Sequence, residues 1–171
     1  MTVFLTLVRA LVYATLFVAF GLVFLPARIL GATGIVAPSE IGAAQIGGMI
    51  LTGAGSLLVL GAILAFVFVG KGTAAPFDPP RRLVTTGPFR FVRNPIYIGA
   101  LLGMVGAALY YGSTGLLLYA LALAMGFHVL VRVYEEPVLR RSFGPEYEAY
   151  CQRVSRWIPI SRQVRSGEPR G

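Results

Sequence analysis

The stretch Gly87-Pro-Phe-Arg-Phe-Val-Arg-Asn-Pro-Ile-Tyr-Ile-Gly99 joins a basic, proline-containing loop to an apolar segment. Pro95 stands where a helix is expected to begin, because the missing N–H of proline is not needed at the first helical position. A second polar segment, residues 128–137, ends the next apolar segment along the chain. Two polar segments in a mainly apolar chain predict one functional site, provided that the fold brings them together.

The composition is that of a membrane protein. Of the 171 residues, 56% are hydrophobic and 13% are charged, whereas a soluble domain has about a quarter charged residues. The net charge of +8 comes from basic residues that cluster in residues 71–93 and 132–170, beside apolar segments. This distribution follows the positive-inside rule and argues against a nucleic-acid partner. A single cysteine and a single histidine rule out an internal disulfide and argue against a metal centre.

Four apolar segments predict an all-α integral membrane protein with four transmembrane helices. They cover residues 3–25, 41–69, 95–111 and 115–134, which are lengths suited to the roughly 30 Å hydrocarbon core of a bilayer. The first segment is expected to be retained, because no Ala-x-Ala-like cleavage site follows it. Residues 26–40 are expected to form a loop. We expect a single domain over residues 1–171, with both termini in the cytoplasm and a bacterial inner membrane as its location.

Small residues recur at helical spacing in two of the apolar segments. The second segment has Gly48, Thr52 and Gly55, and the third has Gly99, Gly103 and Gly106. Stripes of this kind allow two helix backbones to approach closely. The pattern therefore predicts helix packing at these positions.

The C-terminal region is expected to lie at the membrane surface. Residues 144–155 predict an amphipathic helix that begins at the Gly144-Pro145 pair. Tyr147 and Tyr150 share its apolar face, and Trp157 is suited to anchor it at the membrane interface. Residues 161–171 are polar and are expected to be a flexible tail.

The second polar segment places ionisable side chains along one stripe of a helix. His128, Arg132 and Glu135 are separated by four and three residues, and Glu136 flanks them. Charged groups beside the hydrocarbon are costly unless they pair or line a polar cavity, so they favour a functional site. An Arg132–Glu136 ion pair with a purely structural role is the alternative. Because antiparallel helices with a short connection are neighbours, Asn94 and the two glutamates are expected to meet at the same end.

The ordered set of motifs resembles the isoprenylcysteine carboxyl methyltransferase and phospholipid methyltransferase superfamily. The stretch Arg93-Asn-Pro-Ile-Tyr-Ile-Gly99 is similar to the Arg-His-Pro-x-Tyr-x-Gly signature of that superfamily, with Asn94 at the position of the histidine. The later motifs are Glu135-Glu136-Pro-x-Leu139, Phe143-Gly144-x-x-Tyr147-x-x-Tyr150 and Arg156-Trp157-Ile158-Pro159. The resemblance covers roughly residues 81–159. The Gly-x-Gly of phospholipid N-methyltransferases is not intact here.

The resemblance implies an integral-membrane enzyme that transfers a methyl group from S-adenosylmethionine. The acceptor is lipophilic or small and membrane-permeable, and carries a carboxylate, an amine or a thiol. By matching position, the cofactor-binding residues would be Arg90, Arg93, Asn94, Pro95, Tyr97, Gly99, Glu135, Glu136, Tyr147, Tyr150, Arg153 and Trp157. The candidates for catalysis are Glu135, Glu136, His128 and Arg132.

Two other classes of function remain open from the sequence. One is a membrane reductase of the sterol or steroid type that uses NADPH, whose C-terminal architecture is related. The other is a small four-helix membrane protein without enzymatic activity. The identity of the acceptor and the oligomeric state are not determined by these motifs.

Overall fold

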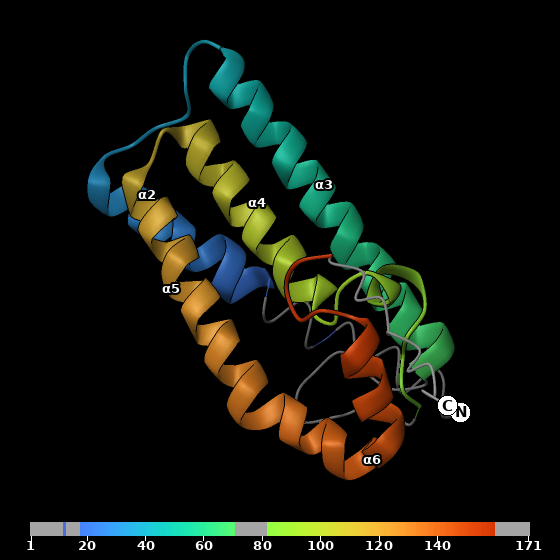
Figure 1. Cartoon of the computed structure of the whole chain (residues 1–171). Coiled ribbons are helices and arrows are strands. Elements are labelled where there is room, and N and C mark those ends of the chain that lie inside the picture. Colours follow the sequence, from blue (N-terminus) through green and yellow to red (C-terminus); the bar gives the residue numbers. More distant parts are fainter. Residues whose placement is uncertain (1–11, 13–17, 71–81, 160–171) are drawn as a thin grey trace, which may run out of the picture.

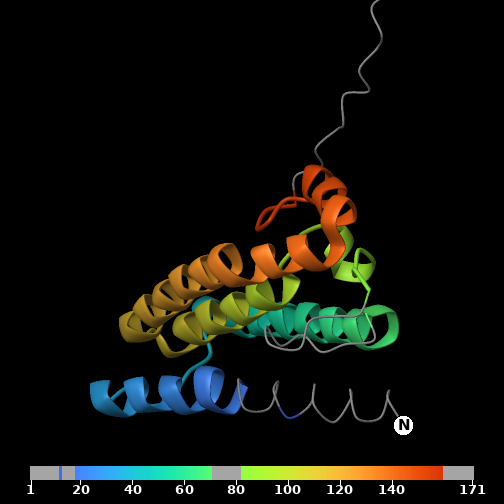
Figure 2. The ribbon, with the colours of Figure 1, turned by 90° about the horizontal axis from the view of Figure 1, so that it is seen from below.

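The computed structural model describes residues 12, 18–70 and 82–159, which form a helical protein (Figure 1). In chain order its elements are the π-helical turn η1 (Val18–Phe24), α2 (Leu25–Thr33), α3 (Ala43–Ala65), the π-helical end η2 (Phe66–Gly70), the 3-10 turn η3 (Gly87–Arg90), α4 (Pro95–Tyr111), α5 (Thr114–Leu130), the π-helical end η4 (Val131–Glu135) and α6 (Glu136–Arg153). Helices α3, α4 and α5 run side by side, and α2 and α6 lie on opposite sides of them (Figure 2). The all-α prediction is confirmed over the described ranges.

Helices α3 and α4 pack through glycine, as the small-residue stripes predict. A Cβ atom added to Gly55 would lie 2.4 Å from the carbonyl oxygen of Gly99, and one added to Gly48 would lie 2.5 Å from the carbonyl oxygen of Gly106. The two backbones are therefore in contact with no room for a side chain between them. Gly103 differs from its neighbours in the stripe, because an added Cβ there would have nothing within 4 Å.

We predict opposite effects for two alanine substitutions on α4. Gly99→Ala should lower the free energy of unfolding by about 1–3 kcal/mol, because the new methyl group overlaps α3 and forces the two helices apart. Gly103→Ala should be neutral or stabilising by up to about 1 kcal/mol, because alanine favours a helix over glycine and meets open space. Thermal unfolding of both variants in detergent measures the difference. Equal destabilisation by both would show that the α3–α4 contact is wrongly placed.

The α4–α5 hairpin follows the sequence prediction closely. Gly112 ends α4 with a φ of +59°, a left-handed conformation that favours glycine. The side chain of Ser113 then accepts a hydrogen bond from the backbone N–H of Leu116 and caps α5. Below this turn the two helices bury a small apolar cluster, which is formed by Met104, Ala108, Leu116 and Ala120.

The prediction of a loop over residues 26–40 is wrong for its first part, because helix α2 continues to Thr33. Pro26 interrupts helical hydrogen bonding by lacking an N–H, but it lies at the start of α2, where proline is tolerated. The wider turn η1 precedes it, and the hydroxyl of Tyr119 donates a hydrogen bond of 2.9 Å to the carbonyl of Gly21. The first predicted span, residues 3–25, falls mostly outside the described residues, as does the predicted tail 161–171.

The predicted helix start at the Gly144-Pro145 pair agrees with the backbone, whereas the residues before this pair are helical where no helix was predicted. The chain stays helical from α5 through η4 into α6, and α6 begins at Glu136. Gly144 has non-helical backbone angles, a φ of +49° and a ψ of −123°, and divides α6 into two helical segments, the second of which begins at Pro145. Beyond Gly144, Tyr147 and Tyr150 are buried against Leu83 and Leu139. The apolar face of this segment is therefore covered by protein, and its placement at a membrane surface stays a prediction.

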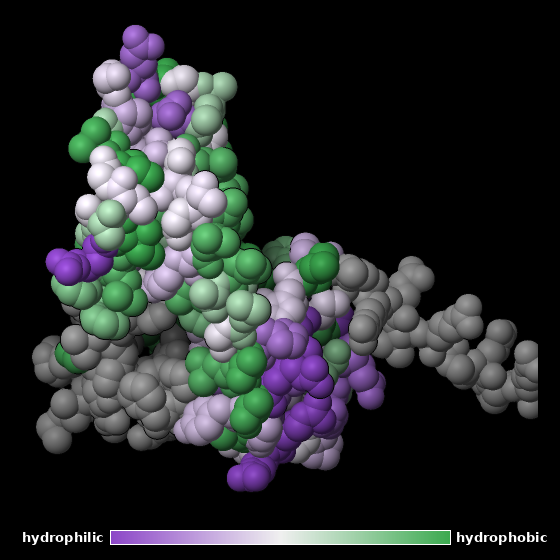
Figure 3. All heavy atoms as spheres, turned by 90° about the vertical axis from the view of Figure 1, so that its left-hand side faces the viewer, coloured by the Kyte–Doolittle hydropathy of each residue, from purple (hydrophilic) through white to green (hydrophobic). Residues whose placement is uncertain are grey.

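Two helices of the described residues are long and apolar enough to cross a bilayer, Ala43–Gly70 and Thr114–Arg153. Pro95–Tyr111 and Ala19–Thr33 are shorter apolar helices. Large apolar side chains on the outer faces of α3 and α5 are exposed, among them Ile50 (67%), Leu57 (71%) and Leu118 (62%). Figure 3 shows apolar residues over much of the surface and hydrophilic residues gathered toward one end. Apolar surface of this extent is typical of protein that faces lipid.

Candidate functional site

The C-terminal segment returns to lie beside the loop that precedes α4. Val92 and Ser155 form a parallel β-bridge, and the backbone N–H of Arg93 donates to the carbonyl of Ser155 at 3.0 Å. The side-chain amide of Asn94 donates to the carbonyl of Arg156 at 3.2 Å. Residues far apart in sequence are thus held together at the start of α4, where Pro95 is fully buried. Asn94 therefore acts as a structural link between the two segments.

A buried carboxylate, Glu136, is the centre of this junction. Arg156 binds it in a fork, with Nε donating to Oε1 at 2.7 Å and Nη2 donating to Oε2 at 2.8 Å. Arg93 approaches from the other side, with its Nη2 3.2 Å from Oε1. The side chain of Glu136 is 8% exposed. Burial raises the pKa of Glu136, but the Arg156 hydrogen bonds and the charges of both arginines outweigh it and hold the pKa below its usual value.

One nitrogen of the Arg93 guanidinium has no hydrogen-bond partner among the described residues. Nη1 of Arg93 donates to the sulfur of Cys151, and Nη2 of Arg93 pairs with Glu136. Its Nε is buried and has no partner within the described part of the chain. Because an unsatisfied buried N–H is costly, a free donor on a buried guanidinium is suited to a bound anionic group.

Tyr97 and Glu135 form a second polar pair one turn into α4. The Tyr97 hydroxyl donates to Oε1 of Glu135, and the Tyr97 ring stacks on Phe127 with 4.5 Å between the ring centroids. Glu135 and Glu136 are adjacent in sequence, yet they point to different partners. The sequence places both on one side of the site, whereas the structure uses Glu136 to hold the C-terminal segment and Glu135 to hold Tyr97.

His128 and Trp157 make a third contact between α5 and the C-terminal segment. The indole Nε1 of Trp157 donates to Nδ1 of His128 at 3.2 Å. Since an indole nitrogen is only a donor, Nδ1 of His128 carries no proton, and a neutral ring then has its proton on Nε2. The unprotonated nitrogen of His128 is therefore already engaged by Trp157, which argues against the role of general base that the sequence suggests for it.

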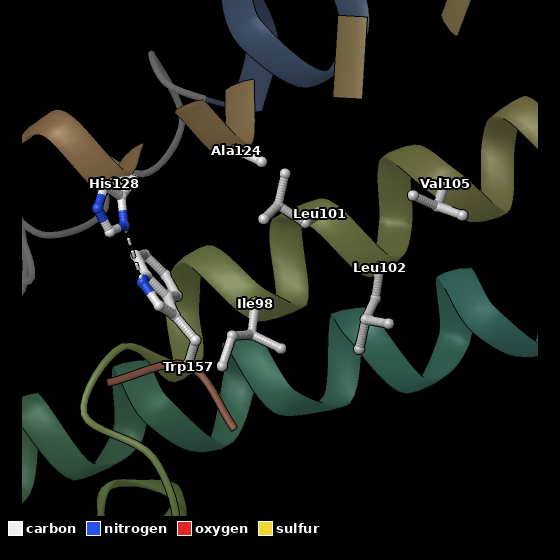
Figure 4. Close-up of a pocket in the computed structure, with 7 residues that line it drawn as sticks. All are labelled: Ile98, Leu101, Leu102, Val105, Ala124, His128 and Trp157. Atoms are coloured by element: carbon white, nitrogen blue, oxygen red, sulfur yellow. Dashed lines mark hydrogen bonds between the residues drawn. The ribbon is translucent and has the colours of Figure 1, made fainter. Parts of the chain in front are cut away.

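A pocket of about 380 Å³ opens beside this contact, between α4 and α5 (Figure 4). One face of α4 lines it with residues at helical spacing, namely Ile98, Leu101, Leu102 and Val105. Ala124 and His128 of α5 and Trp157 of the C-terminal segment complete the lining. The pocket is almost entirely apolar and adjoins the polar residues described above.

The two tyrosines of α6 support the site from behind. The Tyr150 hydroxyl donates to the carbonyl of Phe89 at 2.7 Å and so fixes the loop before α4. Tyr147 and Tyr150 are 2% and 4% exposed, and burial raises the pKa of both phenols. They pack next to Arg93 and Cys151 and act as structural supports.

Four residues predicted for the site do not join these contacts. Arg90 lies over the ring of Phe91, 4.8 Å from its centroid, and Arg153 donates to the carbonyl of Ala149 on its own helix. Arg132 is exposed. Gly99 faces α3. The proposed Arg132–Glu136 pairing is replaced by the pairing of Glu136 with Arg93 and Arg156.

Sequence reasoning missed two members of the cluster, Arg156 and Cys151. Arg156 is part of the Arg-Trp-Ile-Pro motif, so the motif itself was the available signal. Its role depends on the return of the chain to α4, which hydropathy does not show. Cys151 carries no comparable signal, because a lone cysteine on an apolar helix face is indistinguishable from a core residue.

The fold and the site define a class of protein: a helical membrane-type protein with a charged, partly buried cluster at the polar end of an apolar helix hairpin. The family model "Phospholipid methyltransferase" matches residues 43–146. The matched range covers well over half of the chain. It includes helices α3, α4 and α5 and the two glutamates of the site, Glu135 and Glu136. The chain belongs to the phospholipid methyltransferase family.

Curated proteins from bacteria and plants are similar to this chain. The nickel-cobalt-cadmium resistance protein NccN of Alcaligenes xylosoxydans xylosoxydans is 32% identical over 65% of this chain and 54% of its own length. Methanethiol S-methyltransferase 1 of Bradyrhizobium diazoefficiens is 38% identical over 50% of this chain and 29% of its own. Protein-S-isoprenylcysteine O-methyltransferase B of Arabidopsis thaliana is 31% identical over 61% of this chain and 57% of its own. The chain thus spans about half the length of these relatives or less. No solved structure matches.

Proposed function

We propose that this protein is an S-adenosylmethionine-dependent methyltransferase that acts within a membrane on a lipophilic or small membrane-permeable acceptor. The observation that carries the proposal is the free, buried Nε of Arg93, a residue within the family's matched region. The names of two relatives, a methanethiol S-methyltransferase and an isoprenylcysteine O-methyltransferase, support transfer of a methyl group. They act on different acceptors, so the acceptor here is argued from this chain's own residues.

The residues present fit this cofactor. A guanidinium donor suits the carboxylate of its methionyl part, and Arg93 has such a donor free. Tyr97 and Glu135 offer a hydroxyl and a carboxylate for its hydroxyl or amino groups. The Tyr97 and Phe127 rings, stacked on each other, offer aromatic faces that attract a positive charge.

S-adenosylmethionine, when bound, supplies a methyl group on a positively charged sulfur that is already a good leaving group. The protein must then mainly align donor and acceptor, and alignment alone can contribute on the order of 7–11 kcal/mol to lowering the barrier. An amine or thiol acceptor also has to lose a proton. Glu135 is the group placed to take it, because Glu136 is occupied by two arginines and Nδ1 of His128 already accepts a hydrogen bond from Trp157. An ionised carboxylate acceptor needs no base.

The membrane arrangement is part of the proposal. We propose four transmembrane segments with the Arg93–Glu136 junction at their cytoplasmic end. Arg82, Arg90 and Arg93 precede α4, and Arg140, Arg141 and Arg153 lie on α6 at the same end, as the positive-inside rule requires. Both termini are then cytoplasmic, and α6 lies at the surface held by its contacts with the loop before α4. A bacterial inner membrane is the proposed location, and the whole chain is proposed to act as one domain.

A labelled-methyl assay tests the function. Membranes that contain this protein should transfer label from S-adenosylmethionine to a membrane-soluble product that is absent from control membranes. Glu135→Gln should slow the transfer by about 100-fold or more if the acceptor must lose a proton. The control Glu148→Gln changes an exposed carboxylate of α6, which pairs with Arg140, and should leave the rate unchanged. Full activity of a folded Glu135→Gln variant would show that Glu135 takes no proton.

A further inference from the structure

We infer that the apolar pocket between α4 and α5 holds the uncharged hydrocarbon part of the methyl acceptor, with a size limit of roughly 15 non-hydrogen atoms. This inference rests on the proposed function and specifies the substrate class of the same site. Its occupant is argued from the chemistry, the volume and the position of the pocket.

The chemistry of the lining excludes a charged or strongly polar occupant. The α4 wall and Ala124 are apolar. Two of the three ring nitrogens on the lining side chains, Nε1 of Trp157 and Nδ1 of His128, bond to each other. The other ring nitrogen of His128 points away from the apolar side chains (Figure 4). A polar headgroup placed here would lose its hydration with no hydrogen bond in return, which is strongly unfavourable.

The volume limits how much of the occupant the pocket can hold. A cavity of about 150 Å³ holds benzene, so a pocket of about 380 Å³ has room for roughly 15 non-hydrogen atoms. A full diacyl phospholipid is much larger than this. The pocket therefore suits a single short chain or a small ring system.

The position of the pocket directs one end of the occupant to the reacting groups. Leu101 of the lining lies one turn after Tyr97 on the same face of α4, and the Tyr97 ring stacks on Phe127 of α5. Val105 lies one turn farther along α4, and Ala124 lies one turn before His128 on α5. The atom that receives the methyl group would thus lie near the Tyr97–Glu135 pair, with the hydrocarbon extending between α4 and α5. Ala124 is the specificity-determining position, because its small side chain leaves this space open.

The chain has one tryptophan, and it lines the pocket, so its fluorescence reports occupancy. Purified full-length protein in detergent is titrated with 1-bromoalkanes of 6 to 18 carbons, whose bromine quenches indole fluorescence on contact. Quenching should saturate, and affinity expressed against the free aqueous concentration of each bromoalkane should rise about fourfold for each added methylene. The affinity should then level off at about the bromoalkane chain length that fills the pocket. Quenching that rises linearly without saturation, or affinity that shows no plateau with length, overturns the inference.

Two variants separate the pocket from the surrounding micelle. Ala124→Phe should weaken binding of the longer bromoalkanes by at least tenfold, since the new ring fills the space. Val105 lies at the end of the pocket away from Trp157 (Figure 4), so Val105→Phe should move the plateau in affinity to shorter bromoalkanes. This second variant tests the inference if Ala124→Phe does not fold. The control Leu121→Phe adds a ring on the outer face of α5, where Leu121 is 58% exposed, and should change nothing. Equal quenching in all three variants overturns the inference.

The same samples distinguish this inference from the function on which it rests. Calorimetric heat with S-adenosylhomocysteine, together with quenching that does not saturate, overturns the pocket assignment alone. Saturable, length-limited quenching without such heat supports the apolar ligand class and overturns the methyltransferase proposal instead.

Discussion

Replacing Glu136 by glutamine is expected to lower the free energy of unfolding by about 3–5 kcal/mol. The carboxylate is 8% exposed and binds Arg93, whose side chain is 11% exposed, as well as Arg156. Glutamine keeps the shape but removes the charge, so two guanidinium groups are left close together without a counter-ion. The C-terminal segment should detach from α4 as a result. Thermal unfolding in detergent, followed by circular dichroism, measures the loss.

Glu148→Gln is the matched control on the same helix. It removes the ion pair with Arg140, in which the side chains are 48% and 46% exposed, and exposed pairs contribute only about 0–1 kcal/mol. Similar losses in the two variants would mean that Glu136 is no more buried or better paired in the protein than Glu148. The account of the junction would then be wrong.

Replacing Arg93 by lysine is expected to weaken binding of S-adenosylhomocysteine by roughly 10- to 100-fold, as loss of a hydrogen bond to a charged group usually does. Lysine keeps a positive charge toward Glu136 but lacks the Nε–H that is free in the structure. The stability of this variant should therefore fall less than that of Glu136→Gln, so the loss of affinity can be measured on folded protein. Isothermal calorimetry measures the affinity, and thermal unfolding measures the stability.

Arg90→Lys is the control for this prediction. Arg90 belongs to the same loop and carries the same charge, but it is exposed over the ring of Phe91. Its replacement should leave affinity for S-adenosylhomocysteine within about twofold of the wild type. Equal weakening of S-adenosylhomocysteine binding by both substitutions would show that the net charge of the loop is the cause. It would contradict the proposal that Nε of Arg93 binds the cofactor.

The three central helices were predictable because their signals are local. The predicted segment 41–69 corresponds to Ala43–Gly70 and 95–111 to Pro95–Tyr111, and 115–134 lies within Thr114–Glu135. Pro95 and Gly112 mark the ends of α4 through their own backbone preferences. Close packing of α3 on α4 was also predictable, since Gly48 and Gly55 leave no side chain between the backbones.

The errors in the fold lie at prolines. The predicted spans end at residues 25 and 134, just before Pro26 and Pro137, whereas the chain continues in helical conformation past both prolines. In both places a π-helical turn directly precedes the α-helix in which the proline is the second residue. Proline near a helix start needs no N–H partner, and a single sequence does not reveal the wider turn that makes this possible.

The site was predictable in its location and only partly in its contacts. The α4–α5 hairpin brings Tyr97 to Glu135, as short-loop topology requires. The positions of Arg156 and Trp157 depend on the return of the C-terminal segment to Arg93 and His128, a tertiary contact with no periodic pattern. The separate partners of Glu135 and Glu136 follow from a 100° step between neighbouring helix residues, so adjacent glutamates face different ways.

The central claim is that this fold binds S-adenosylmethionine at the Arg93–Glu136 junction. Its most direct test is calorimetric titration of S-adenosylmethionine and S-adenosylhomocysteine into purified full-length protein in detergent, with NADPH as the comparison ligand. The account predicts heat that saturates at one ligand per chain for both sulfur compounds, a rise in unfolding temperature with either, and no heat with NADPH. A folded protein that gives no heat with either sulfur compound, or that gives heat with NADPH alone, would contradict it.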